Sequence, residues 1–216
     1  MRTITWSALP RFSVFLLVLA VGCASPEIRQ EIPEGKSPIA APLAGLPATF
    51  ANTPGCEDCL SLTLTLRPDG AYLVRERVRG SEFYDFGRWR EGPEGLVLEG
   101  SRDAPRRYAP KSPDMLDSLP GTLGGDLKRQ PQVEPLRGPF RVVGSFDGAA
   151  FRECRTGLVW PLGESRPGER LKEEFAVRAL AQALVAIDGR FEAQGGREVL
   201  VVQRPATVLT VVACPG

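Results

Sequence analysis

Five cysteines and the absence of histidine define the chemistry open to this 216-residue chain. Cys56 and Cys59 form a Cys-Glu-Asp-Cys motif, Cys154 and Cys214 lie in the second half, and Cys23 follows an apolar run. Catalytic triads that depend on histidine are excluded, and there is no glycine-rich phosphate loop. We therefore expect thiol chemistry in a protein that is not an enzyme.

Three interpretations are open for Cys56 and Cys59. Thiol exchange needs an activated thiolate at a helix N-terminus or beside cations, but the two intervening residues are acidic and a strand pattern follows. Two soft thiolates suit Cu(I), although the methionines are only Met1 and Met115, so further soft ligands are scarce. The third interpretation is a disulfide that reports redox or folding state, or that pins the loop.

The cysteines other than Cys23 divide evenly between the two halves of the chain, which favours two local disulfides in an oxidising compartment. A Cys154–Cys214 bond closes a loop of about 60 residues and is expected to stabilise its half by up to about 3 to 4 kcal/mol. A Cys56–Cys59 bond closes a very short loop and constrains the chain far less.

The first residues have the form of an export signal. Arg2 and Arg11 precede an uncharged apolar run over residues 12–22, which is about half of the roughly 20 residues that a membrane-spanning helix needs. Ala20-Val-Gly-Cys23 is similar to the lipobox of bacterial prolipoproteins. We expect residues 1–22 to be removed and Cys23 to carry lipid. The alternative is an ordinary signal peptide with an incidental cysteine.

The residue directly after the lipobox cysteine is Ala24, not an aspartate. By resemblance to Gram-negative sorting rules, this favours anchoring in the outer membrane, with the protein facing the periplasm. Loss of Arg2 and Arg11 leaves 25 basic residues against 26 acidic ones. That balance gives no support to nucleic-acid binding.

The pattern along the chain predicts a tether and then a barrel. Residues 23–43 contain four prolines and no apolar period, as in a linker. Alternating apolar residues from Leu60 onward indicate short strands, and Arg67-Pro-Asp-Gly70 is typical of a hairpin turn. We predict an antiparallel β-barrel over residues 44–120.

Glycine and proline in residues 121–135 indicate a linker to a second domain over residues 136–216. There, three strand patterns precede a helix expected over residues 169–186, and two or three strands follow it, the last over 207–212. A helix inserted after the third strand of a small barrel is the oligonucleotide/oligosaccharide-binding (OB) arrangement. Trp89 and Trp160 are expected in the core.

Several motifs, in order, resemble the NlpE copper-resistance lipoprotein family. They are Leu46-Pro-Ala-Thr-Phe through Cys56-Glu-Asp-Cys59, Leu62-Thr-Leu-Thr-Leu-Arg-Pro-Asp-Gly-Ala-Tyr72, Gly87-Arg-Trp89, Leu136-Arg-Gly-Pro-Phe140, Phe151-Arg-Glu-Cys-Arg-Thr-Gly157 and the late Cys214. The resemblance implies a mainly β protein with an N-terminal lipocalin-like antiparallel barrel and a C-terminal OB-fold barrel with one inserted helix. It covers nearly the whole chain after the leader.

The resemblance also implies a role. Members of the family are outer-membrane lipoproteins that sense envelope or copper stress and activate an inner-membrane sensor kinase of the Cpx type. Cys56 and Cys59 match the family's CxxC pair, and Cys154 and Cys214 match its C-terminal disulfide. The alternative is a lipocalin-like carrier of a small apolar ligand, or a periplasmic copper carrier. An enlarged barrel cavity favours the carrier, and a filled barrel favours the sensor.

Overall fold

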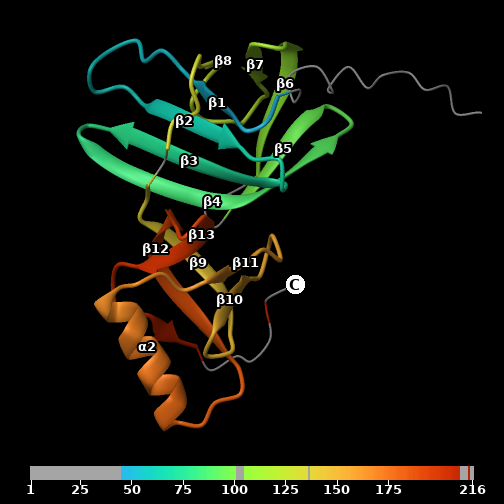
Figure 1. Cartoon of the computed structure of the whole chain (residues 1–216). Coiled ribbons are helices and arrows are strands. Elements are labelled where there is room, and N and C mark those ends of the chain that lie inside the picture. The colour runs from blue at the N-terminus through green and yellow to red at the C-terminus, as the bar shows by residue number, and fades with distance from the viewer. Residues whose placement is uncertain (1–44, 101–104, 136, 210–213, 215–216) are drawn as a thin grey trace, which may run out of the picture. The chain divides into compact units, whose positions relative to one another are not determined.

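The computed structural model describes residues 45–100, 105–135, 137–209 and 214 (Figure 1). Cys23, the leader over residues 1–22 and the tether over residues 23–43 lie outside these residues, so lipidation and the tether stay predictions. Within the described part of the chain, no helix has the length and apolar character needed to cross a membrane.

Eight antiparallel strands form a closed barrel in which each strand pairs with its neighbours in the sequence and the last pairs with the first. Eight-stranded up-and-down barrels are the lipocalin architecture, so the prediction for the first half is confirmed. The strands are β1 (Ala48–Ala51), β2 (Ser61–Leu66), β3 (Ala71–Val78), β4 (Ser81–Gly92), β5 (Gly95–Gly100), β6 (Arg106–Ser112), β7 (Met115–Ser118) and β8 (Leu127–Arg129).

The barrel extends beyond the predicted boundary at residue 120. Strand β8 lies inside the segment 121–135 that was expected to be a linker, and it pairs with β1 through Phe50↔Arg129 and Ala51↔Lys128. A strand of three residues with only Leu127 buried is too short to show an alternating pattern. The connection between the barrels therefore begins after Arg129.

The hairpin turn predicted at residues 67–70 joins β2 to β3. Gly70 has a φ of 81°, the left-handed conformation that favours glycine, and its N–H donates to the carbonyl oxygen of Arg67 at 3.3 Å. The carboxylate of Asp69 accepts a hydrogen bond from the Ala71 N–H at 3.1 Å. This turn fixes the direction in which Arg67 leaves the barrel.

Twelve side chains, each exposed by 2% or less, pack as one apolar cluster inside the barrel. They come from all the strands except β4, and this occupied interior is the arrangement expected of the sensor. The cluster consists of Ala48, Phe50, Leu62, Leu64, Leu66, Tyr72, Val74, Leu96, Leu98, Tyr108, Leu116 and Leu127.

A buried polar pair lies within this apolar interior. The hydroxyl of Tyr72 donates to Asp85 Oδ2 at 2.8 Å, and a Cβ on Gly100 would lie 2.0 Å from both oxygens, so β5 needs glycine there. Burial, together with the negative charge of Asp85, holds the pKa of Tyr72 above its ordinary value. Burial raises the pKa of Tyr108 to about 12.

These tyrosines predict a loss of stability in alkali. Above about pH 10 the unfolded chain loses tyrosine protons that the folded chain keeps up to the pKa of about 12 of Tyr108. The stabilisation is complete below about pH 10, so the free energy of unfolding falls as the pH rises through this window. Urea unfolding at about pH 9 and pH 11 measures the fall. A Tyr108→Phe variant should lose less between these pH values, and an equal loss in both proteins would contradict the assignment.

The second half forms a curled sheet with the strand order β11-β10-β9-β12-β13, with β14 paired to β12. A parallel bridge between Leu162 and Leu200 brings the chain after β11 beside β13, so the sheet curls into a partly open barrel of the predicted OB type. Residues 210–213 of the predicted last strand lie outside the described residues. The elements are β9 (Phe140–Phe146), β10 (Ala150–Glu153), β11 (Val159–Pro161), α2 (Arg166–Val177), β12 (Ala183–Gln194), β13 (Arg197–Val202) and β14 (Thr207–Val208).

The helix predicted over residues 169–186 is shorter and begins earlier. Ser165 caps α2 by accepting a hydrogen bond from the Gly168 N–H at 3.1 Å. Residues 183–187 are all buried and belong to β12, not to the helix. A continuous apolar run of this kind fits a fully buried strand as well as a helix, so the apolar spacing could not separate them.

Candidate functional site

The Cys56–Cys59 pair lies in the loop between β1 and β2 and forms a disulfide, as predicted, with 5.1 Å between the Cα atoms. Asn52 closes the base of this loop. Its side-chain N–H donates to the carbonyl oxygen of Leu60 at 2.8 Å, and its side-chain oxygen accepts from the Leu62 N–H at 2.7 Å. No sequence pattern marks Asn52, which holds the cysteine loop as an exposed turn on the barrel.

The donor set around Cys56 and Cys59 limits metal binding. In the described ranges of the chain, no group of three or more histidine, cysteine, aspartate or glutamate residues is placed to hold a metal ion. A copper ion here would therefore have two sulfur ligands, and both must first be released from the disulfide as thiolates. Two-coordinate Cu(I) fits that donor set.

The second predicted disulfide joins Cys154 to Cys214, which are 60 residues apart in the sequence. Cys154 directly follows β10, and its N–H donates to the carbonyl oxygen of Val143 in β9 at 2.9 Å. Glu153 beside it is only 4% exposed and accepts hydrogen bonds from the main-chain N–H groups of Arg155 and Thr156 at 3.0 and 2.7 Å. This carboxylate organises the turn that follows Cys154, so the bond ties Cys214 to that turn.

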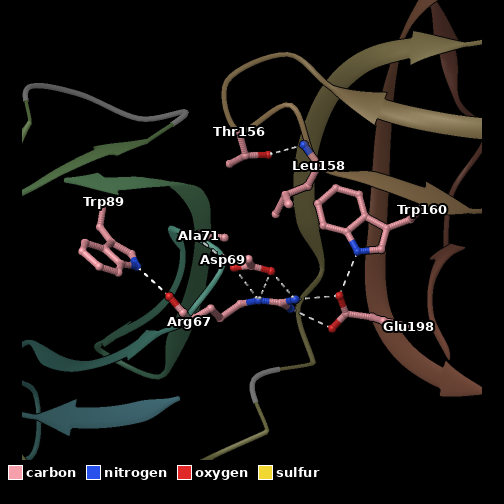
Figure 2. Close-up of polar contacts among 8 residues, drawn as sticks. All are labelled: Arg67, Asp69, Ala71, Trp89, Thr156, Leu158, Trp160 and Glu198. Atoms are coloured by element: carbon pink, nitrogen blue, oxygen red, sulfur yellow. Dashed lines mark hydrogen bonds and ion pairs between the residues drawn. The ribbon is translucent and has the colours of Figure 1, made fainter. Parts of the chain in front are cut away.

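A polar contact also joins the two barrels (Figure 2). The guanidinium of Arg67 donates to both carboxylate oxygens of Glu198 in β13, at 2.7 and 2.9 Å, and also to Asp69. The same Glu198 accepts a hydrogen bond from Trp160 Nε1 at 2.8 Å. We refer to Arg67, Glu198 and Trp160 as the inter-barrel contact.

Trp89 fixes Arg67 from the barrel side. Its indole N–H donates to the carbonyl oxygen of Arg67 at 2.9 Å, and its main-chain N–H donates to that of Gly70 at 2.8 Å. Burial opposes the charge on Arg67, but hydrogen bonds to Glu198 and Asp69 outweigh it and hold the pKa of Arg67 above its ordinary value. Arg67 is therefore a cation that stays charged in the contact.

An apolar contact lies beside this polar one. Leu73 and Phe86, on the outer face of β3 and β4, belong to the same buried cluster as the core of the second barrel. The Phe86 ring centroid is 5.7 Å from that of Trp160, 5.2 Å from that of Phe191 and 6.5 Å from that of Phe140. The expectation that Trp160 is a core residue is confirmed, since it is only 4% exposed.

The fold and the site define a mainly β protein with an eight-stranded up-and-down barrel, an OB-type barrel and one disulfide in each. No family model matches the chain, and no curated protein matches its sequence. Among solved structures, the chain is similar to the crystal structure of the Cpx pathway activator NlpE from Escherichia coli, at 23% identity and a TM-score of 0.34. The similarity covers 79% of this chain and 100% of that one.

Proposed function

We propose that this chain is an outer-membrane lipoprotein of the NlpE type, which faces the periplasm and signals envelope or copper stress to an inner-membrane sensor kinase. The observation that carries this proposal is the presence of one disulfide in each barrel of a histidine-free chain, whose first residues have the pattern of a lipoprotein leader. Each bond depends on oxidative folding of its own barrel. The pair of bonds therefore reports whether the exported chain has matured.

The filled first barrel supports a sensor in preference to a carrier. Tyr72, Tyr108 and the leucines around them occupy the interior that a lipocalin would use for its ligand. Lipid on Cys23 supplies the second condition of the proposed mechanism. An anchored molecule stays at the outer membrane, whereas a molecule that fails to sort remains near the inner-membrane kinase.

A copper carrier is the second candidate function, and the exposed position of Cys56 favours it. After reduction, the sulfurs of Cys56 and Cys59 would hold Cu(I). The role of the protein would then be to transport or sense the metal. Titration of the reduced protein with Cu(I) against a competing chelator tests this function. Affinity no better than that of an ordinary dithiol peptide would exclude it.

The sensing role is tested by replacing Cys56 and Cys59 with serine and, separately, Cys154 and Cys214. We expect the Cys154→Ser, Cys214→Ser protein to raise the output of an envelope-stress reporter, because it imitates a chain that has not been oxidised. The Cys56→Ser, Cys59→Ser protein should change copper tolerance if that pair senses the metal.

Ser81→Ala, an exposed change at the first residue of β4, is the matched control, and immunoblots confirm equal protein amounts. Unchanged reporter output and unchanged copper tolerance in both cysteine variants would contradict redox sensing.

A further inference from the structure

The OB barrel has two ends, and different elements cover them. Phe140 and Phe146 lie at opposite ends of β9. At the Phe146 end, helix α2 covers the core, with the rings of Phe146 and Phe175 4.7 Å apart. At the Phe140 end, the cover is the outer face of the first barrel, through Leu73 and Phe86. The first barrel thus completes the core of the second.

The inter-barrel contact fastens this cover at its edge. Glu198 binds Arg67 of the first barrel and Trp160 of the second at the same time, so the polar contact and the aromatic contact meet at one carboxylate. Loss of the Arg67 contact leaves Glu198 bonded to Trp160 alone. The apolar side chains that the first barrel contributes to the cluster are Ala71, Leu73 and Phe86, with Tyr84 packed against them.

Residues 130–134, at the start of the connection between the barrels, are held to the first barrel. The N–H groups of Gln130 and Glu134 donate to the main-chain and side-chain oxygens of Thr49 at 2.8 and 2.9 Å, and the Glu134 carboxylate pairs with Arg75 at 2.6 Å. After Glu134 the chain passes to Phe140 through Gly138, which has a φ of 82°. Interfaces between folded units of one chain commonly resemble transient protein–protein interfaces, which lets neighbouring units separate.

We propose that the first barrel is a removable cover on the OB barrel, held by Arg67, Glu198 and Trp160. Undocking breaks the inter-barrel contact and exposes Phe140, Trp160 and Phe191 while both barrels keep their strands. The state of the first barrel thereby controls which surface the second barrel presents. This inference holds or fails independently of the stress-signalling role, because it concerns the contact between the barrels alone.

Hydrogen–deuterium exchange of the full chain, followed by mass spectrometry, tests this proposal. Arg67→Ala and Phe86→Ala should each speed exchange in β13 and at the Phe140 end of β9 by about tenfold or more, as expected for easier local opening. Amides of β2 and β8 in the first barrel should change by less than about twofold. Arg77→Ala, which removes the exposed Arg77–Glu82 pair at the turn between β3 and β4, is the matched control and should change neither barrel.

Glu198→Gln changes the second-barrel side of the same contact. The amide oxygen can still accept from Trp160, but the ion pair with Arg67 is lost, so exchange should rise in the same segments by about threefold. Two results would overturn the proposal. One is unchanged exchange in the second barrel in all three interface variants, and the other is an equal rise in both barrels, which is the mark of general unfolding.

Discussion

Replacing Cys154 and Cys214 together with serine should lower the free energy of unfolding by about 3 to 4 kcal/mol. The reason is the length of the loop that the bond closes, since the two residues lie 60 positions apart. Without the bond, the unfolded second barrel regains the freedom of that loop, and Cys214 is no longer held to the turn after β10. Urea denaturation without reductant measures the loss.

The short disulfide provides the comparison for this variant. Cys56 and Cys59 are only 3 positions apart, so the Cys56→Ser, Cys59→Ser protein should lose about 2 kcal/mol or less. Equal losses in the two double variants would show that the long bond does not act by restricting the unfolded chain.

Phe50→Ala should destabilise the protein about as much as loss of the Cys154–Cys214 bond, lowering the free energy of unfolding by about 3 to 5 kcal/mol. Phe50 is 0% exposed and lies opposite Arg129 on the seam where β1 meets β8, with the Arg129 guanidinium 5.8 Å from the centre of its ring. Truncation leaves a cavity at the pairing that closes the barrel. Thermal and urea unfolding, monitored by circular dichroism, give the change.

Phe83→Ala serves as the control for this change, because Phe83 is an aromatic residue of the same barrel that is 37% exposed. Its loss should be under about 1 kcal/mol. A loss this small for Phe50→Ala would mean that the seam between β1 and β8 contributes little to the stability of the barrel.

Local patterns predicted most of the fold. The alternation from Leu62 to Leu66 places three leucines in the barrel interior, and the Pro-Asp-Gly sequence ends at a glycine with positive φ. Patterns failed where an element was very short, as in β8, or where tertiary contacts decided the burial. Thr63 and Thr65 have the polar character of an outer face, yet they are 4% and 3% exposed, and Thr65 shares a hydrogen bond of 2.9 Å with Thr49.

Only part of the candidate site could be predicted from the sequence. Two cysteines other than Cys23 fall in each half of the chain, so two local disulfides could be predicted from the sequence. The contact between Arg67 and Glu198 joins residues 131 positions apart, and no local spacing marks such a pair. Asn52 and Glu153 act through main-chain hydrogen bonds that depend on the folded loop.

Strand β8 is the last strand of the first barrel in the sequence, so its synthesis determines when the barrel can close. Pairings between consecutive strands of the first barrel join segments that are close in the sequence. The pairing of Phe50 with Arg129 joins residues almost 80 positions apart, so it can form only after that length of chain has been made. A chain that emerges from its N-terminus can form the hairpin of β2 and β3 early, but its barrel stays open until Arg129 is available. During that interval the apolar interior faces solvent. Chain emergence up to Arg129 is therefore a period in which a newly made molecule is exposed to misassembly.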